Sequence, residues 1–369
     1  MKQRTFLPAD FQLSTWESVL PYFEKLSATE ISSIADLRTF CANRSELESY
    51  LSENFAWRYI KMSCDNQNET LQTSYAQFVN EIMPNASVFD DAWNKKVIES
   101  PFVNELTETG FPVMLRGMKK AIEIFREENI PLFTELQNLE TNYGALTGAL
   151  MVTIKGEEKT LQQAGALLES TDRAEREEVY QTMVQKRLTI KNELNDLYTS
   201  LIEKRHQVAL NAGFENYRDY KFAELGRFDY TKEDCFQFHE AVKLHVLPLI
   251  DKIYARKKQK LGLEVLKPWD TEAEPAGVLP LKPFTNGQDL YEKTVTCFEQ
   301  LDPFFAACLR KMNELKHFDL ESRKGKAPGG YNCPLAESGA PFIFMNAASQ
   351  MSDVTTMVHE GGHAVHSFL

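Results

Sequence analysis

The residues with the clearest chemical potential are two histidines and a glutamate close to the end of the sequence. His359, Glu360 and His363 form the pattern H-E-x-x-H. In an α-helix each residue turns by about 100° and rises by about 1.5 Å, so the two histidines share one face, one turn apart. Two imidazole nitrogens on one face can bind one Zn²⁺ at roughly 2.0–2.1 Å. We therefore predict that His359 and His363 are zinc ligands.

Glu360 follows the first histidine and should face a zinc-bound water rather than the metal itself. Zinc lowers the pKa of such a water toward about 7, and a neighbouring carboxylate can accept its proton. The resulting hydroxide-like nucleophile can attack a peptide carbonyl that the metal also polarises. We predict Glu360 as the general base of a hydrolase. The alternative for this motif is a buried helix that carries polar residues on one face and binds no metal.

The residues around the motif favour the zinc interpretation. The flanking segment 355–358 carries no charge, and neither do Gly361, Gly362 and residues 364–365. An uncharged helix suits a buried metal site, because an additional charge there would cost desolvation energy or compete for the metal. Each glycine also costs about 1 kcal/mol relative to alanine within a helix. The glycine pair therefore predicts a close approach to the helix backbone, by substrate or by a neighbouring strand.

A third histidine, His366, lies seven residues after His359 and within about 20° of the same helix face. Three ligands in line on one straight helix cannot surround a tetrahedral ion. We therefore predict that His366 supports the site or packs beside it rather than binding the metal. The motif region does not supply a visible third protein ligand.

The elements that position the motif are predicted to be mostly helices. One helical pattern begins near Asp172 and continues to about Leu210, and a second begins at Thr231, with a kink expected at Pro248, and continues to about Leu261. We predict that the apolar residues of both patterns belong to the core. These residues include Val179, Met183, Leu197, Tyr198, Leu201, Ile202, Phe238, Val242 and Leu249.

Strand signals are confined to two short segments. Residues 149–154 precede the turn pair Lys155-Gly156, and residues 341–346 precede the metal helix. An exposed edge along 342–346, next to the glycine-rich segment 325–332, could bind an extended peptide by strand addition. The alternative is a connecting loop and a buried strand. The segment 267–287 is rich in proline, glycine and acidic residues, which predicts a long loop.

The composition limits the classes of partner and compartment. With 41 Lys and Arg against 53 Asp and Glu, the net charge is −12, which argues against a nucleic-acid partner. No apolar stretch is long enough to span a membrane, and residues 1–8 lack the apolar run of a signal peptide. The six scattered cysteines show no disulfide pattern. We predict a cytoplasmic protein, and the sequence does not indicate its oligomeric state.

Taken together, these motifs resemble the zinc metallopeptidase family of thimet oligopeptidase and oligoendopeptidase F. The similarity rests on four segments, namely 359–366, 325–331, 267–270 and 205–217. It implies a mainly α, multi-helix zincin-like fold with a small β element before the metal helix. It also implies a deep channel that admits oligopeptide substrates and excludes folded proteins. We expect an N-terminal helical region over 1–195 and the first part of a catalytic domain over 196–369.

The sequence departs from this family at its end. Family members place a glutamate ligand on a second helix well after the motif, whereas this sequence stops at Leu369. We therefore expect the N-terminal part of a longer enzyme. The leading hypothesis is a zinc-dependent endopeptidase that cleaves short peptides. The alternatives are a non-catalytic helical fragment that binds peptides or a partner, and a helical zinc carboxypeptidase of a related fold.

Overall fold

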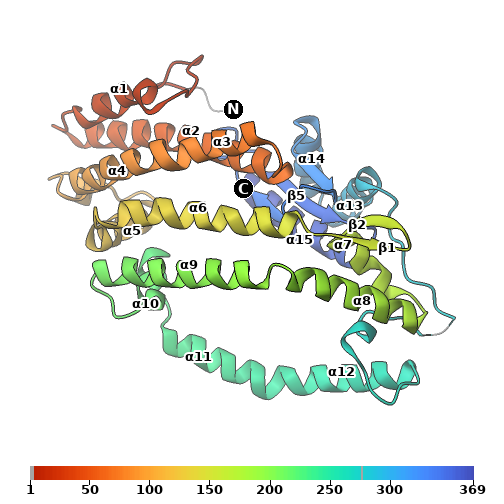
Figure 1. The fold of residues 1–369 in the computed structure, drawn as a ribbon. Helices are drawn as coiled ribbons and strands as arrows, with labels where there is room; N and C mark the ends of the chain where they lie inside the picture. The colour runs from red at the N-terminus through yellow and green to blue at the C-terminus, as the bar shows by residue number, and fades with distance from the viewer. Residues whose placement is uncertain (1–3, 276) are drawn as a thin grey trace. The chain divides into compact units, whose positions relative to one another are not determined.

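A computed structural model describes residues 4–275 and 277–369 (Figure 1). The chain divides into two compact units. The first unit comprises residues up to 144, together with 195–228 and 334–339. The second unit comprises residues 145–194, 229–333 and 340–369. Helices dominate both units, so the predicted mainly α fold class is confirmed. The predicted division into 1–195 and 196–369 stays a prediction.

The first unit is a set of long helices around an aromatic core. The rings of Phe23 and Trp93 stack with centroids 5.1 Å apart, and both side chains are buried. The helices, with short π and 3₁₀ turns labelled η, are α1 (Trp16–Ser27), α2 (Ile34–Cys64), α3 (Glu69–Gln77), η1 (Phe78–Ile82), α4 (Met83–Ile98), η2 (Val103–Glu105), α5 (Phe111–Ile124), α6 (Asn129–Gly148), α9 (Lys191–Asn211) and α10 (Tyr217–Glu224). Helices α6 and α9 continue beyond the unit at one end.

The second unit combines two small sheets with helices and contains the H-E-x-x-H motif. Its elements are β1 (Met151–Ile154), β2 (Glu157–Thr160), α7 (Leu161–Gly165), η3 (Ala166–Glu169), α8 (Arg173–Leu188), α11 (Lys232–Ala241), η4 (Val242–Val246), α12 (Leu247–Lys260), η5 (Pro268–Asp270), α13 (Gly287–Leu301), α14 (Pro303–Glu314), β3 (Phe318–Glu321), β4 (Tyr331–Cys333), β5 (Phe342–Ala347) and α15 (Met351–Phe368). The H-E-x-x-H motif lies on α15, as its spacing predicted.

The three-stranded sheet lies directly before the metal-site helix in sequence and packs against it. Its strand order is β3-β5-β4, with β5 parallel to β3 and antiparallel to β4. Alternate side chains of β5, at Ile343, Met345 and Ala347, belong to the same buried cluster as Met357 and Val365 of α15. The prediction of a strand near 341–346 is confirmed. Of the two alternatives stated for it, the buried strand is correct and the exposed edge is wrong. Both edges of β5 are paired, and β3 and β4 are the outer strands.

The other predicted strand, at 149–154, is confirmed as β1. It pairs with β2 through a tight turn in which Lys155 has φ 51° and Gly156 has φ 83°. Two consecutive residues with positive φ are typical of the turn that matches the twist of a two-residue hairpin. The partner strand was not predicted because its sequence, Glu157 to Thr160, is mostly charged.

The first helical pattern forms two helices rather than one. Helix α8 ends at Leu188 and α9 begins at Lys191. The Thr189 hydroxyl donates a 2.7 Å hydrogen bond to the Lys186 carbonyl, which competes with continuation of the helix. Only some of the apolar residues of this first helical pattern are buried in the core. Val179, Met183, Leu197 and Leu201 are buried, whereas Tyr198 and Ile202 are exposed.

The second helical pattern forms α11, η4 and α12. The predicted start is confirmed, since Asp234 accepts hydrogen bonds from the Thr231 backbone and hydroxyl groups. The irregularity expected at Pro248 is the π turn η4, which ends just before this proline, where a backbone donor is missing. The predicted core role is wrong, because Phe238 is 67% exposed and Leu249 is 54% exposed. Periodicity identifies an apolar surface but does not establish that the described residues cover it.

Beyond these elements, a buried ion-pair cluster attaches the segment 267–270 to helix α8. Asp270 is fully buried and accepts hydrogen bonds from Arg173 at 3.0 and 2.9 Å and from Arg176 at 2.8 Å. Burial by itself would raise the pKa of Asp270, but these hydrogen bonds outweigh it and hold the pKa at about 2. The carboxylate therefore remains charged and joins two segments that are distant in sequence.

Two predictions from composition can be compared with the structure. None of the helices in the described ranges combines the length and the apolar character that a membrane span requires. The six cysteines all lie within these ranges, and none of them forms a disulfide. Of the segment 1–8, whose lack of an apolar run was noted above, residues 1–3 lie outside the described residues.

Candidate metal centre

Helix α15 carries the motif and presents its two sides to different surroundings. The Asp353 carboxylate accepts hydrogen bonds from the backbone N–H groups of Ala348 at 2.8 Å and Gln350 at 2.9 Å, which fixes the start of the helix. Met357, Gly361, Ala364 and Val365 form the buried side. The side chains of His359 and His363 are exposed. The structure therefore places both predicted ligands on the side of α15 that faces away from the hydrophobic cluster.

The two histidines converge on each other. Their Nε2 atoms are 3.1 Å apart, and their rings are perpendicular, with centroids 4.6 Å apart. Two nitrogens at about 2.05 Å from one ion and 3.1 Å apart subtend an angle of about 100° at that ion, close to a tetrahedral angle. The pair therefore fits two positions of a tetrahedral zinc site. Without a metal, the same contact is a hydrogen bond when one of the two Nε2 atoms carries a hydrogen and the other accepts it.

The described residues bring together two of the predicted ligands and no complete set of three. Among residues 4–275 and 277–369, no group of three or more His, Cys, Asp or Glu side chains is placed to hold a metal ion. His366 is exposed on the same helix and does not complete such a group with the histidine pair. Water, or groups outside the described residues, would have to fill the remaining positions around a tetrahedral ion.

Glu360 occupies a different environment from the histidines. It lies about 100° around the helix from His359, and it is only 8% exposed. Its neighbour Gly361 is buried, on the side of α15 that faces the hydrophobic cluster. The carboxylate is thus held at the boundary between the core and the exposed histidine face. Its role as general base stays a prediction.

The two glycines of the motif differ in how much space surrounds them. A Cβ atom added at Gly361 would lie 3.0 and 3.1 Å from ring atoms of Phe298 on α13, whereas one added at Gly362 would meet no described atom within 4 Å. The close approach predicted for the glycine pair therefore exists at Gly361 only, and a core aromatic ring makes it, not a strand. Gly362 leaves open space beside the histidines.

This difference predicts opposite effects for two neighbouring substitutions. Gly361→Ala should lower the free energy of unfolding by about 1–2 kcal/mol, because the buried Phe298 ring cannot move without repacking the core. Gly362→Ala, the matched control, should raise it by up to about 1 kcal/mol through helix propensity. Urea unfolding of both variants measures the two values. Equal effects would show that Phe298 does not limit the space at Gly361.

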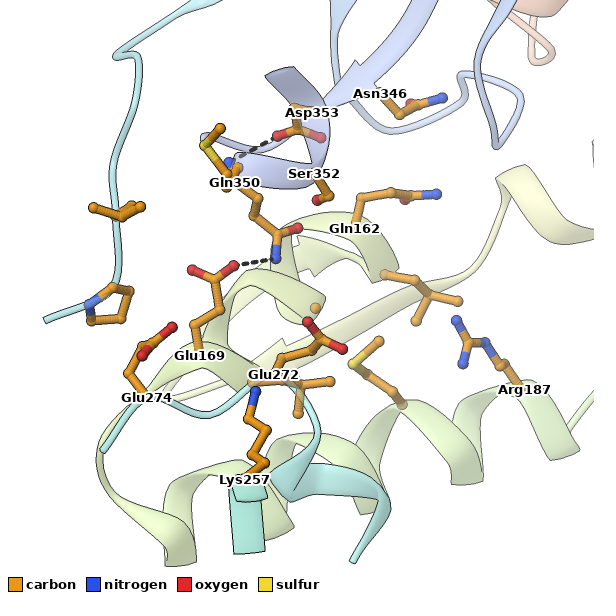
Figure 2. Close-up of a pocket in the computed structure, with 17 residues that line it drawn as sticks. Gln162, Glu169, Arg187, Lys257, Glu272, Glu274, Asn346, Gln350, Ser352 and Asp353 are labelled. Atoms are coloured by element: carbon orange, nitrogen blue, oxygen red, sulfur yellow. Dashed lines mark hydrogen bonds between the residues drawn. The ribbon is translucent and has the colours of Figure 1, made fainter. Parts of the chain in front are cut away.

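A separate cavity of about 660 Å³ lies at the N-terminal end of α15 (Figure 2). Gln350 there donates a 3.1 Å hydrogen bond to Glu169, and Arg187 and Lys257 also line the cavity. None of the motif residues lines it, so its size does not make it the site of the chemistry. Its lining comes from segments far apart in the sequence, and no local sequence pattern could have identified it.

Comparisons with known proteins agree with these features. The model of "Peptidase family M3" matches residues 166–369, and that of the "Peptidase M3 N-terminal domain" matches residues 6–125. Group B oligopeptidase PepB of Streptococcus agalactiae is 24% identical over 344 residues, which cover 91% of this chain and 52% of PepB. An oligoendopeptidase F homologue of Borreliella burgdorferi is 27% identical over 261 residues, covering 68% of this chain and 42% of that protein.

The fold is also similar to solved structures. The structure of PZ peptidase A with an inhibitor superposes with a TM-score of 0.90 at 24% identity, covering 97% of this chain and 64% of that one. Oligoendopeptidase F from Enterococcus faecium gives a TM-score of 0.57 at 18% identity, covering 81% and 64%. The chain thus spans about half the length of PepB and less than two thirds of these two solved chains.

Proposed function

Because the chain belongs to peptidase family M3, we propose that it is a zinc-dependent endopeptidase that hydrolyses short peptides. In this proposal His359 and His363 bind the zinc ion and Glu360 is the general base. The observation that carries the proposal is the 3.1 Å approach of the two Nε2 atoms on the exposed side of a helix whose other side is anchored in the core.

Each motif residue has a defined task in this mechanism. A bound zinc ion supplies a Lewis acid and lowers the pKa of its water toward about 7. The Nε2 atoms of His359 and His363 would hold the ion on the exposed face of α15. A carboxylate oxygen of Glu360 accepts the proton of the attacking water and afterwards delivers it to the amine of the leaving peptide. Gly361 and its buried neighbours anchor α15 in the core and so keep the two histidines and Glu360 in fixed positions.

The outer edge of β4 is the surface that best suits an extended peptide. Within the described residues β4 is an outer strand of its sheet, and an extended peptide can bind to an outer strand by strand addition. Gly330, which precedes β4, lies against Thr356 of α15, since a Cβ there would be 3.3 Å from the Thr356 methyl carbon. Thr356 and His363 are seven residues apart and share a helix face. A peptide on β4 would therefore pass the histidine face of α15.

Cleavage of an internally quenched oligopeptide tests the proposed function. We expect hydrolysis that a chelator abolishes and that stoichiometric zinc restores. A peptide with an amidated C-terminus should be cut equally well, which distinguishes an endopeptidase from the carboxypeptidase alternative. Peptide binding without any hydrolysis in the presence of zinc would instead support a non-catalytic binding fragment.

One structural observation keeps that second function in consideration. The described residues bring together the two proposed zinc ligands but no group of three, and the chain spans about half the length of PepB. A chain with this ligand set could bind peptides on β4 without completing the reaction. We also propose that the chain comprises a helical region over 1–195 and a catalytic region over 196–369. Oligopeptides are the proposed substrate class.

A further inference from the structure

We propose that Lys326 is a positioning residue that holds the edge strand β4 in place beside the metal-site helix. This inference rests on the proposed function, because it assigns β4 to peptide binding. Lys326 lies in the segment that joins β3 to β4, and it does not belong to the H-E-x-x-H motif. Its role follows from three sets of contacts, which lead from the β3–β5 pair to the edge strand.

The first set surrounds the ammonium group of Lys326, whose side chain is 0% exposed. Its Nζ atom donates to the Asp319 carbonyl at 3.0 Å, the Asp319 carboxylate at 2.8 Å and the Glu321 carbonyl at 2.9 Å. It also donates to the carbonyl of Met345 on β5. A buried ammonium is tolerated only with such partners. They span the point where the β3–β5 register shifts, between Asp319 and Glu321.

The second set connects the same ammonium group to the edge strand through an aromatic stack. Nζ of Lys326 lies 4.4 Å from the centroid of the Phe344 ring. The ring of Tyr331 on β4 stacks on Phe344 at 4.7 Å with an interplanar angle of 4°. Because a parallel ring occupies one face of Phe344, the ammonium must occupy the other face. The two residues are also cross-strand partners, so the stack fixes the β4–β5 register.

The third set fixes the loop between Lys326 and β4. The Asn346 side-chain amide donates to the carbonyl oxygens of Ala327 at 2.7 Å and Gly329 at 2.8 Å. Gly330, the next residue, packs against Thr356 of α15. Lys326 and Asn346 therefore hold the two ends of a short glycine-rich loop. The position of β4 relative to the histidine face depends on this loop.

Peptide binding to the metal-free protein tests this role without any dependence on hydrolysis. The probe is a fluorescein-labelled alanine–valine oligopeptide with blocked termini, which can bind chiefly through its backbone, and the readout is fluorescence anisotropy. We expect Lys326→Met to raise the peptide dissociation constant by about tenfold or more, as small displacements of positioning groups do. Zinc affinity should change by less than about twofold, because Lys326 lies outside the motif.

Lys324→Met is the matched control, because Lys324 lies in the same segment between β3 and β4 but is exposed and pairs with Glu158 at 3.2 Å on the surface. It should leave both affinities unchanged. Asn346→Ala provides an independent variant if Lys326→Met does not fold. It removes the two loop hydrogen bonds and should also weaken peptide binding without changing zinc affinity.

The outcomes separate this inference from the proposed function. Selective loss of peptide affinity in Lys326→Met or Asn346→Ala supports the positioning role. Wild-type and folded variant proteins that bind the peptide equally would overturn it and leave the proposed function intact. Parallel loss of peptide and zinc affinity would also overturn it, since that result indicates general destabilisation. A wild-type protein that binds zinc but no peptide would contradict both the positioning role and the assignment of β4.

Discussion

Glu360→Gln should lower peptide hydrolysis by about 10²–10⁴-fold while leaving zinc binding unchanged. Glutamine has nearly the same shape as glutamate, so it can occupy the same buried position beside Gly361. Its amide cannot accept the proton of the attacking water at neutral pH. The histidine pair is untouched by this change. The expected result is therefore a zinc-binding protein with a low kcat, measured with the quenched peptide and by elemental analysis.

A matched control for this variant is Glu169→Gln, which makes the same change in the separate cavity at the start of α15. Glu169 accepts a hydrogen bond from Gln350 and lies outside the motif. We expect its hydrolysis rate to stay close to that of the wild-type protein. Retention of most of the hydrolytic activity by Glu360→Gln would refute the assigned role of Glu360. A large loss of hydrolysis in Glu169→Gln alone would indicate that the reaction takes place at the cavity and not at the histidine pair.

Asp270→Ala should lower the free energy of unfolding by about 3–5 kcal/mol, the usual cost of removing one partner from a buried ion pair. Arg176 is itself buried and would lose its carboxylate partner. Segment 267–270 would also lose the ion pairs that connect it to α8. Urea unfolding monitored by circular dichroism measures the change. Asp251→Ala on the exposed surface of α12 is the control and should change stability by less than about 0.5 kcal/mol.

The same carboxylate predicts the pH dependence of stability. Its pKa is about 2 in the folded protein, whereas an aspartate in an unfolded chain titrates near 3.9. The unfolded state therefore binds the proton more readily, and the contribution of Asp270 is present above about pH 4. It is lost as the pH falls from about 4 to about 2 and amounts to about 2–3 kcal/mol. The stability difference between wild type and Asp270→Asn should shrink over that interval, and a constant difference would contradict the assigned pKa.

The local parts of the site could be predicted from sequence because helix geometry alone determines them. The spacing of His359 and His363 places both residues on one face, and the structure shows their Nε2 atoms together. The two glycines could not be distinguished in this way. Only the packing of Phe298 from α13 shows that Gly361 is confined and Gly362 is open.

The edge strand could not be predicted, because it depends on which short segments pair. Strand β5 has a clear apolar pattern, but β4 has only three residues and β3 contains two acidic residues. Their pairing on either side makes β5 the central strand, contrary to the expectation of an exposed edge. Lys326 gave a weaker signal, a lysine after Gly325 in a glycine-rich segment, and sequence alone does not show that its ammonium group is buried.

The most direct test of the zinc assignment is a calorimetric titration of zinc into the metal-free protein, compared with the double variant His359→Ala/His363→Ala. We expect one zinc ion per wild-type chain at a site that the double variant lacks. This comparison does not depend on hydrolysis or on the identity of further ligands. Equal zinc binding by the two proteins would contradict the assignment of His359 and His363 as the metal ligands.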